Sequence, residues 1–349
     1  MNLSLFEDEK REEKKNGPMQ NLYSPYCDFI YYPSSHDPNL MLAMRITKPA
    51  KPGYILAATH GWHMTIEPFA AMDEPMENDP YLRVQVDMRG RAYSQGQQDC
   101  NGYELLDVID AVNYVRREYA QYILDPEVVY FESGSGGGGN AYALAGKCPD
   151  FFAAVNTLYG ITDYGVWYDH DQVGEFRDEM DVWVGTTPQA DPMAYASRSG
   201  LTVLPNLLAP LFMTHGETDE RVPVEQARMY AERAKVLGKD GLIEYYEMAG
   251  VGNQDHAGNI TPEQDEKMRR LAAENLTGHI TPISIPRKGT MVGAGYLVTK
   301  EFSVFLDSVD KVAQVDYDLD EGTFEVNCPV LCNYKISIPM DRQNKAIIF

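Results

Sequence analysis

Short apolar runs bounded by turn residues alternate with longer amphipathic stretches along most of the chain. The short runs predict strands, and stretches with apolar residues three or four apart predict helices. Predicted strands cover 27–32, 40–47, 54–59, 82–87, 128–131, 151–158, 210–214 and 242–248, and predicted helices cover 102–120, 141–145, 224–237 and 262–276. Strands that alternate with helices predict an α/β protein with a doubly wound, mostly parallel sheet.

The pattern changes after residue 279. Prolines punctuate short alternating runs such as Phe302–Phe305 and Tyr334–Ile338, which predict a small antiparallel β module. Residues 159–206 form a connection that is long and rich in aromatic residues, so we expect a lid or insertion there. The predicted parts are therefore a polar N-terminal arm over 1–20, an α/β catalytic domain over 21–279 and the β module over 280–349.

Composition narrows the classes of partner. The chain has 52 acidic and 30 basic residues and a net charge of −22, so nucleic acid is not an expected partner, because phosphate contacts need a basic surface. We see no apolar stretch of about 18 residues, the length that spans a membrane. The charged N-terminus does not resemble a signal peptide. Five scattered cysteines favour a reducing compartment, so we expect a cytoplasmic protein that needs no zinc or other metal.

A run of serine and glycine follows the predicted strand 128–131. In one interpretation, Ser133 takes the first small position of a small-x-Ser-x-Gly turn, Ser135 takes the nucleophile position and Gly137 takes the last. Such a strand-to-helix turn holds a nucleophile out at the end of the strand. The backbone N–H of Gly136 would then face an oxyanion.

The same run permits two other interpretations. Residues 134–139 fit G-x-G-x-x-G, which would make the protein a dinucleotide-binding oxidoreductase. That fingerprint needs an acidic residue about 20 positions on. Asp150 is too near, and we expect it to cap a helix end. A glycine-rich turn without chemistry is the second alternative, whereas a P-loop is excluded because Asn140 stands where its lysine is required.

Other chemically capable residues follow other predicted strands. Asp219 comes after strand 210–214, His256 lies in the loop after strand 242–248, and His60-Gly61-Trp62 ends strand 54–59. Carboxyl ends of parallel strands share one sheet edge, so we expect these groups to meet Ser135 there. The order Ser, Asp, His is that of the α/β hydrolases. His256 would take the serine proton, Asp219 would orient His256, and the N–H groups of Trp62 and Gly136 would form the oxyanion hole.

The motifs together resemble the α/β-hydrolase superfamily, within it the prolyl-oligopeptidase-like and acetyl-xylan-esterase-like branch. The resemblance covers residues 25–278 and is carried by His60-Gly61-Trp62, Asp87–Gly96, the turn at Ser135 with Pro149–Phe151, His215–Pro223 and the His256 loop. It implies a serine hydrolase that needs no cofactor and forms an acyl-enzyme. Two residues depart from the family pattern. Ser133 replaces the first glycine and is expected to strain the turn, and Gly136 replaces a residue that is often large, which is expected to open the pocket floor.

The substrate expected from the sequence is a small ester, in particular an acylated carbohydrate. Aromatic side chains of the lid either pack together or line the pocket, and the pocket candidates are His63, Tyr159, Trp167, Tyr168 and Trp183. A prolyl-oligopeptidase-like peptidase is the alternative. It is disfavoured because too few residues precede the first core strand for a propeller, and because no glutamate pair is evident that could hold a peptide amino terminus. A non-catalytic binding protein is an alternative of another class, and the β module is a candidate surface for forming a homo-oligomer.

Overall fold

The computed structural model describes residues 17–67 and 79–339, so most of the predicted N-terminal arm lies outside the described residues. Among these residues, one sheet has nine strands in the order β1-β2-β3-β5-β4-β6-β7-β8-β9. Neighbouring strands are parallel from β5 to β9 and antiparallel from β1 to β5. The strands are β1 (Leu22–Tyr23), β2 (Cys27–Pro33), β3 (Met41–Thr47), β4 (Tyr54–Ala58), β5 (Tyr81–Asp87), β6 (Val129–Gly134), β7 (Ala154–Leu158), β8 (Leu211–Gly216) and β9 (Ile243–Met248). The predicted α/β class is confirmed.

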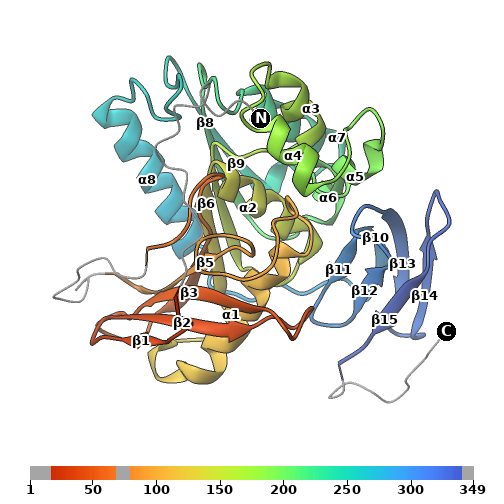
Figure 1. Ribbon diagram of the computed structural model, residues 1–349, viewed down its shortest axis with the longest axis horizontal. Helices are drawn as coiled ribbons and strands as arrows, with labels where there is room; N and C mark the ends of the chain where they lie inside the picture. Colours follow the sequence, from red (N-terminus) through yellow and green to blue (C-terminus); the bar gives the residue numbers. More distant parts are fainter. Residues whose placement is uncertain (1–16, 68–78, 340–349) are drawn as a thin grey trace.

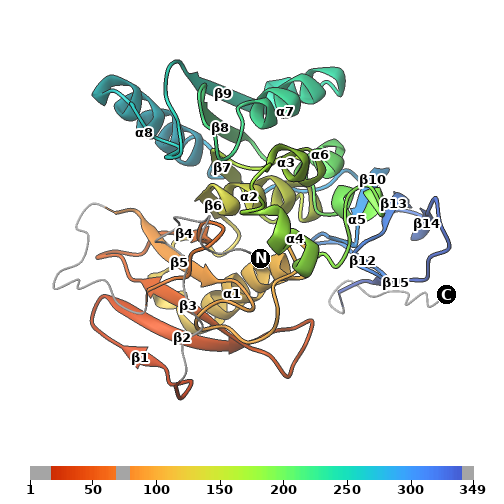
Figure 2. The same cartoon turned by 45° about the horizontal axis from the view of Figure 1, so that its top comes forward.

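Helices cover both faces of this sheet (Figures 1 and 2). Val129 and Phe131 of β6 belong to a core shared with α1, α2 and α7, whereas Tyr130 belongs to a core shared with Leu276 of α8. Burial on both faces explains why the central strands β4, β6, β7 and β8 are mostly apolar. The helices are α1 (Glu104–Glu118), α2 (Gly136–Lys147), α3 (Tyr164–His170), α4 (Arg177–Trp183), α5 (Pro192–Ala196), α6 (Gly200–Val203), α7 (Glu225–Val236) and α8 (Pro262–Thr277), with 3-10 turns η2 (Ala120–Tyr122), η3 (Leu204–Asn206) and η4 (Asp240–Leu242).

Two local predictions were wrong. The helix after β6 begins at Gly136 instead of residue 141, so the glycine run forms its first turn. Close packing overrides the low helix propensity of glycine there, since a Cβ on Gly138 would lie 2.7 Å from Gly160 Cα. Asp150 caps no helix, because its carboxylate accepts hydrogen bonds from Lys300 N at 3.1 and 3.2 Å.

The C-terminal residues form a second, antiparallel sheet (Figure 1), with strand order β14-β13-β10-β11-β12-β15. Its strands are β10 (Lys288–Ala294), β11 (Tyr296–Val298), β12 (Ser303–Leu306), β13 (Val312–Asp318), β14 (Thr323–Asn327) and β15 (Tyr334–Ser337). Tyr296 belongs to the main core, and its hydroxyl donates to Gly102 O at 3.0 Å. The β module is therefore packed firmly on the α/β domain.

The chain order places a switch point beside β6. From β4 the chain goes to β5 on one side, and then crosses to β6 on the other side. Ligands of open α/β sheets bind beyond the carboxyl ends of the strands at such a point. Across the ranges 17–67 and 79–339, no helix has both the length and the apolar character to span a bilayer.

Candidate active site

Ser135 lies in the sharp turn between β6 and α2, with φ 56° and ψ −123°. A non-glycine residue in this region of backbone space is strained, and such strain is typical of a nucleophile elbow. Ser133 does not add to it, because it is not among the residues with a positive φ, and its hydroxyl accepts a hydrogen bond from Thr59 N at 2.8 Å. A Cβ on Gly137 would lie 2.8 Å from Ser133 Cβ, so the glycine makes room for the serine. The expectation that Ser133 strains the turn was wrong.

Three side chains from different loops meet at this turn. His256 Nε2 lies 2.8 Å from Ser135 Oγ, and His256 Nδ1 lies 2.6 Å from Asp219 Oδ2. The other oxygen of Asp219 accepts from Arg221 N and Val222 N, both at 3.0 Å. Asp219 is thus fixed and holds Nδ1 protonated, so Nε2 is free to accept the Ser135 proton. This arrangement can activate a serine hydroxyl for nucleophilic attack.

Two further histidines near the strand ends, His60 and His215, have structural roles. His60 Nε2 accepts a hydrogen bond from Met88 N at 3.1 Å, and burial lowers the pKa of His60 to about 3. His215 donates from Nε2 to Val222 O at 2.7 Å, and burial also lowers its pKa. Both imidazoles are therefore neutral, and their Nε2 atoms are occupied by backbone groups.

The N–H groups of Trp62 and Gly136 are available to an oxyanion, since neither donates a hydrogen bond within the part of the chain that the structure describes. The two backbones are very close: a Cβ on Gly136 would lie 2.7 Å from Trp62 N. The expectation that Gly136 opens the pocket floor was wrong, because the Trp62 backbone fills the space that a side chain would take. Two convergent donors of this kind can stabilise a tetrahedral intermediate.

Two glutamates of the lid, Glu175 and Glu179, bind side chains close to the oxyanion donors Trp62 and Gly136. Glu179 of α4 accepts from Trp62 Nε1 at 2.7 Å and lies 2.8 Å from His63 Nε2, and Glu175 accepts from Arg221 Nη2 at 2.6 Å. Contrary to expectation, two carboxylates lie near the site. No short motif marks them, because their partners are distant in the sequence.

Aromatic side chains fill the space between the lid and the oxyanion donors. Trp62 packs against Trp167 and Trp183 with ring centroids 4.9 and 4.8 Å apart. A cavity of about 20 Å³ remains, and its walls include Gly136, Trp62, Tyr164 and Trp183. This volume has room for about one water molecule.

The predicted pocket residues occupy different places. Trp183 lines the cavity, and Tyr159 stacks on His256 with centroids 5.3 Å apart. Trp167 is buried and donates from Nε1 to Arg221 O at 2.8 Å, and the Tyr168 hydroxyl donates to Asp181 Oδ1 at 2.9 Å. His63 Nε2 lies 2.8 Å from Glu179 Oε2, so His63 contacts the lid.

Two charged residues in the cavity wall were missed from the sequence. Arg91 lies over the Trp183 ring, 5.0 Å from its centroid, and Glu104 accepts from Asn101 N at 2.6 Å. Arg91 belongs to the Asp87–Gly96 motif, which could have pointed to it. In the described ranges, no three His, Cys, Asp or Glu side chains are grouped in a way that could hold a metal ion.

The elbow, the Ser135–His256–Asp219 contacts and the parallel sheet define a serine hydrolase of the α/β-hydrolase class. The chain belongs to the prolyl oligopeptidase family, whose family model matches residues 75–273. This membership confirms the resemblance seen in the sequence. It excludes the dinucleotide interpretation of residues 134–139, in which Gly134 ends β6 and Gly136 and Gly139 lie in the first turn of α2.

Named relatives include peptidases and esterases. The chain is 26% identical over 211 residues to the uncharacterized peptidase YuxL of Bacillus subtilis, a match that covers 55% of this chain and 28% of that protein. It is 27% identical over 153 residues to the probable carboxylic ester hydrolase LipM of Mycobacterium tuberculosis, covering 40% of this chain and 35% of the relative. The matches thus span about a third or less of these relatives.

Among solved structures, the acylaminoacyl peptidase of Pyrococcus horikoshii has a similar fold. The TM-score is 0.59 with 22% identity, over 74% of this chain and 42% of that one. At this identity the likeness is one of fold.

Proposed function

We propose that the protein is a carboxylic ester hydrolase that transfers a small acyl group to Ser135 and then to water. The observation that carries the proposal is the cavity of about 20 Å³ beside Gly136 and Trp62. It is large enough for the methyl group of an acetyl ester and too small for the side chain of a typical amino acid. The relative named as a probable carboxylic ester hydrolase supports the same assignment.

The reaction follows from the positions of the side chains. Ser135 Oγ attacks the ester carbonyl carbon while His256 Nε2 takes its proton, and Asp219 stabilises the imidazolium. The N–H groups of Trp62 and Gly136 bind the oxyanion of the tetrahedral intermediate. The bond to the alcohol oxygen then breaks, and His256 protonates the leaving alkoxide. A water molecule, with His256 as base, repeats the attack on the acyl-enzyme and releases the carboxylic acid and free Ser135.

The expected order of substrates tests this proposal. We expect kcat/KM to fall from 4-nitrophenyl acetate to the butyrate and octanoate esters, and to be at least about 100-fold lower for alanyl and prolyl 4-nitroanilides. Acetylated oligosaccharides belong in the same panel, because an acylated sugar as substrate stays a prediction. Equal or faster cleavage of the anilides would contradict the proposal.

A peptidase is the second candidate, and the glutamate pair favours it. Glu175 and Glu179 lie four residues apart beside the site, where carboxylates could attract a peptide amino terminus. Their carboxylates already contact Arg221 and His63, which weakens this interpretation. If it holds, anilides with a free amino group will be cleaved faster than their N-acetylated counterparts, and Glu175→Gln will remove that preference.

A further inference from the structure

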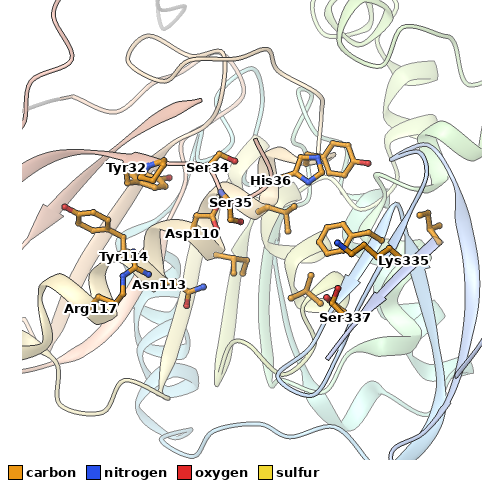
Figure 3. Close-up of a pocket in the computed structure, with 18 residues that line it drawn as sticks. Tyr32, Ser34, Ser35, His36, Asp110, Asn113, Tyr114, Arg117, Lys335 and Ser337 are labelled. Carbon is orange, nitrogen blue, oxygen red and sulfur yellow. Dashed lines mark hydrogen bonds between the residues drawn. The ribbon is translucent and has the colours of Figure 1, made fainter. Parts of the chain in front are cut away.

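A second hollow, of about 730 Å³, lies between helix α1 and the β module (Figure 3). One wall is a single face of α1, where lining residues recur every three or four positions: Leu106, Ile109, Asp110, Asn113, Tyr114 and Arg117. Side chains at this spacing lie on one side of a helix. The hollow shares no lining residue with the Ser135 site, and its volume is typical of a small-molecule site between two structural units.

The opposite wall is one face of the β12–β15 pair. Ser303 lies opposite Ser337, and Phe305 lies opposite Lys335, so these four side chains share that face. Figure 3 shows Lys335 and Ser337 across the hollow from Asn113 and Arg117 of α1. The α/β domain and the β module therefore form the groove jointly.

His36 closes one end of the groove. Its ring stacks on Tyr103, with centroids 3.9 Å apart and planes at 22°, and faces Phe305 at 6.2 Å and 18°. Because Tyr103 precedes α1 and Phe305 belongs to β12, this stack joins the two walls. The floor between them is apolar and includes Leu106, Ile109 and Val298.

The charges in the groove differ from those of the chain as a whole. The chain carries a net charge of −22. The groove is lined by Arg117 and Lys335, which form no ion pair within the described ranges, and by one carboxylate, Asp110, which already accepts from Ser35 N at 2.7 Å. An apolar floor with these two cations complements a ligand that has an apolar body and a negative head.

We infer that this groove is a binding site for an amphipathic carboxylate, such as a medium-chain fatty acid, that is separate from the ester-cleaving site. The carboxylate lies at Lys335, and the apolar chain lies along Phe305 and along Leu106 and Ile109 of α1. Such a ligand contacts both α1 and β15, so its binding also stabilises the packing of the β module on the α/β domain.

Calorimetric titration of the full chain with decanoate tests the inference. We expect saturable binding at one site, and at least about tenfold weaker binding for the double variant Arg117→Gln/Lys335→Gln, because the charged contact at Lys335 and the second positive charge of the groove are both lost. The matched control is Arg233→Gln/Lys235→Gln, which removes an exposed arginine and lysine from α7 and should leave the affinity unchanged. Ser337→Trp, on an exposed position of β15, should block the groove.

Three controls distinguish this site from the active site, from a purely apolar groove and from a dimer interface. Labelling Ser135 with a fluorophosphonate should leave decanoate binding intact, and loss of binding would place the ligand in the active site. Decyltrimethylammonium should bind at least about tenfold more weakly, and equal binding would show that the cations play no part. Sedimentation of the unliganded protein should give a monomer. A dimer that Ser337→Trp dissociates would overturn the inference in favour of a second copy of the chain, as would the absence of saturable decanoate binding.

Discussion

The catalytic edge and the lid are held by different kinds of contact. At the catalytic edge, formed by the loops that carry Trp62, Ser135, Asp219 and His256, backbones approach so closely that only glycine fits between them. Gly136 is fixed in this way against Trp62, and a Cβ on Gly252 would collide with Asp219 N. The lid, residues 159–206, is held instead by side chains, through the aromatic cluster around Trp62 and Trp167 and through the contacts of Glu175 and Glu179.

This difference separates rate from selectivity. Backbone contacts at the edge fix the reacting groups, so a change there alters the chemical step. Two side chains of the lid, Tyr164 and Trp183, line the cavity beside the oxyanion donors, so under the proposed function we expect a change there to alter which substrate reacts. Four predicted effects, taken from the largest to the smallest, test this division.

The largest effect is expected at Ser135. Ser135→Ala removes the nucleophile and should lower kcat by about 10⁴-fold or more, with KM little changed. Ser133→Ala is the matched control, because its hydroxyl lies two residues away and hydrogen-bonds to Thr59. We expect that variant to keep kcat within about tenfold. Activity of Ser135→Ala near the wild-type level on 4-nitrophenyl acetate would exclude the assigned nucleophile.

The next effect tests the backbone contact at the oxyanion donors. Gly136→Ala forces Trp62 N and Gly136 N apart, because the new Cβ would lie 2.7 Å from Trp62 N. Loss of one oxyanion donor lowers kcat by about 10²–10³-fold. Gly241→Ala is the control, since no atom lies within 4 Å of the added Cβ. Thermal unfolding of both variants shows whether they are folded, and an unchanged kcat in a folded Gly136→Ala protein would refute the role of this donor pair.

A smaller effect is expected in the lid, and it concerns selectivity. Trp183→Ala removes one wall of the acyl cavity. The ratio of kcat/KM for 4-nitrophenyl butyrate to that for the acetate should rise at least about tenfold, because room for methylene groups is gained. Val182→Ala changes a neighbouring exposed position of α4 and should leave the ratio unchanged. An equal fall in kcat/KM for all esters would instead show that Trp183 supports the reacting groups and does not set selectivity.

The two regions also differed in how well they could be predicted from the sequence. Ser135, Asp219 and His256 each follow a predicted strand, so the sequence was enough to predict that they meet. Parallel strands bring their carboxyl ends to one sheet edge whatever the details of packing. The packing of the glycines was not predictable, since glycine has the same local preferences whether it lies in a turn or in the first turn of a buried helix.

Contacts of the lid were harder to anticipate. Glu179 meets Trp62 and His63 only because α4 folds back over the β4 loop, and these residues are more than 100 positions apart. Asp150 was assigned to a local cap, but its partner Lys300 is in another structural unit. Side-chain pairs of this kind depend on the complete fold and have no local pattern.

The smallest predicted effect concerns Asp171, whose carboxylate binds the backbone of lid residues 173–177. Asp171 follows α3, and its oxygens accept hydrogen bonds from four backbone N–H groups, those of Val173, Gly174, Phe176 and Arg177, at 2.6–3.2 Å. Burial alone would raise the pKa of Asp171, but these four donors outweigh it, and the pKa is lowered from its ordinary value of 3.8. Asp171→Asn should destabilise the folded protein at pH 7 by about 1–3 kcal/mol, because an amide oxygen cannot replace both carboxylate oxygens.

The pH dependence of this loss is what identifies the carboxylate. A group whose pKa is lowered by folding contributes its stability above the pKa of the unfolded chain, 3.8, and loses it as the pH falls through the lower, folded value. The gap in unfolding temperature between wild type and Asp171→Asn should therefore be constant from pH 7 to 5 and shrink as the pH approaches 3. Asp169→Asn, an exposed change nearby on α3, should leave the unfolding temperature unaltered throughout. A gap for Asp171→Asn that stays the same down to pH 3 would mean that the side chain acts through its shape, and that charge has no part in holding the lid.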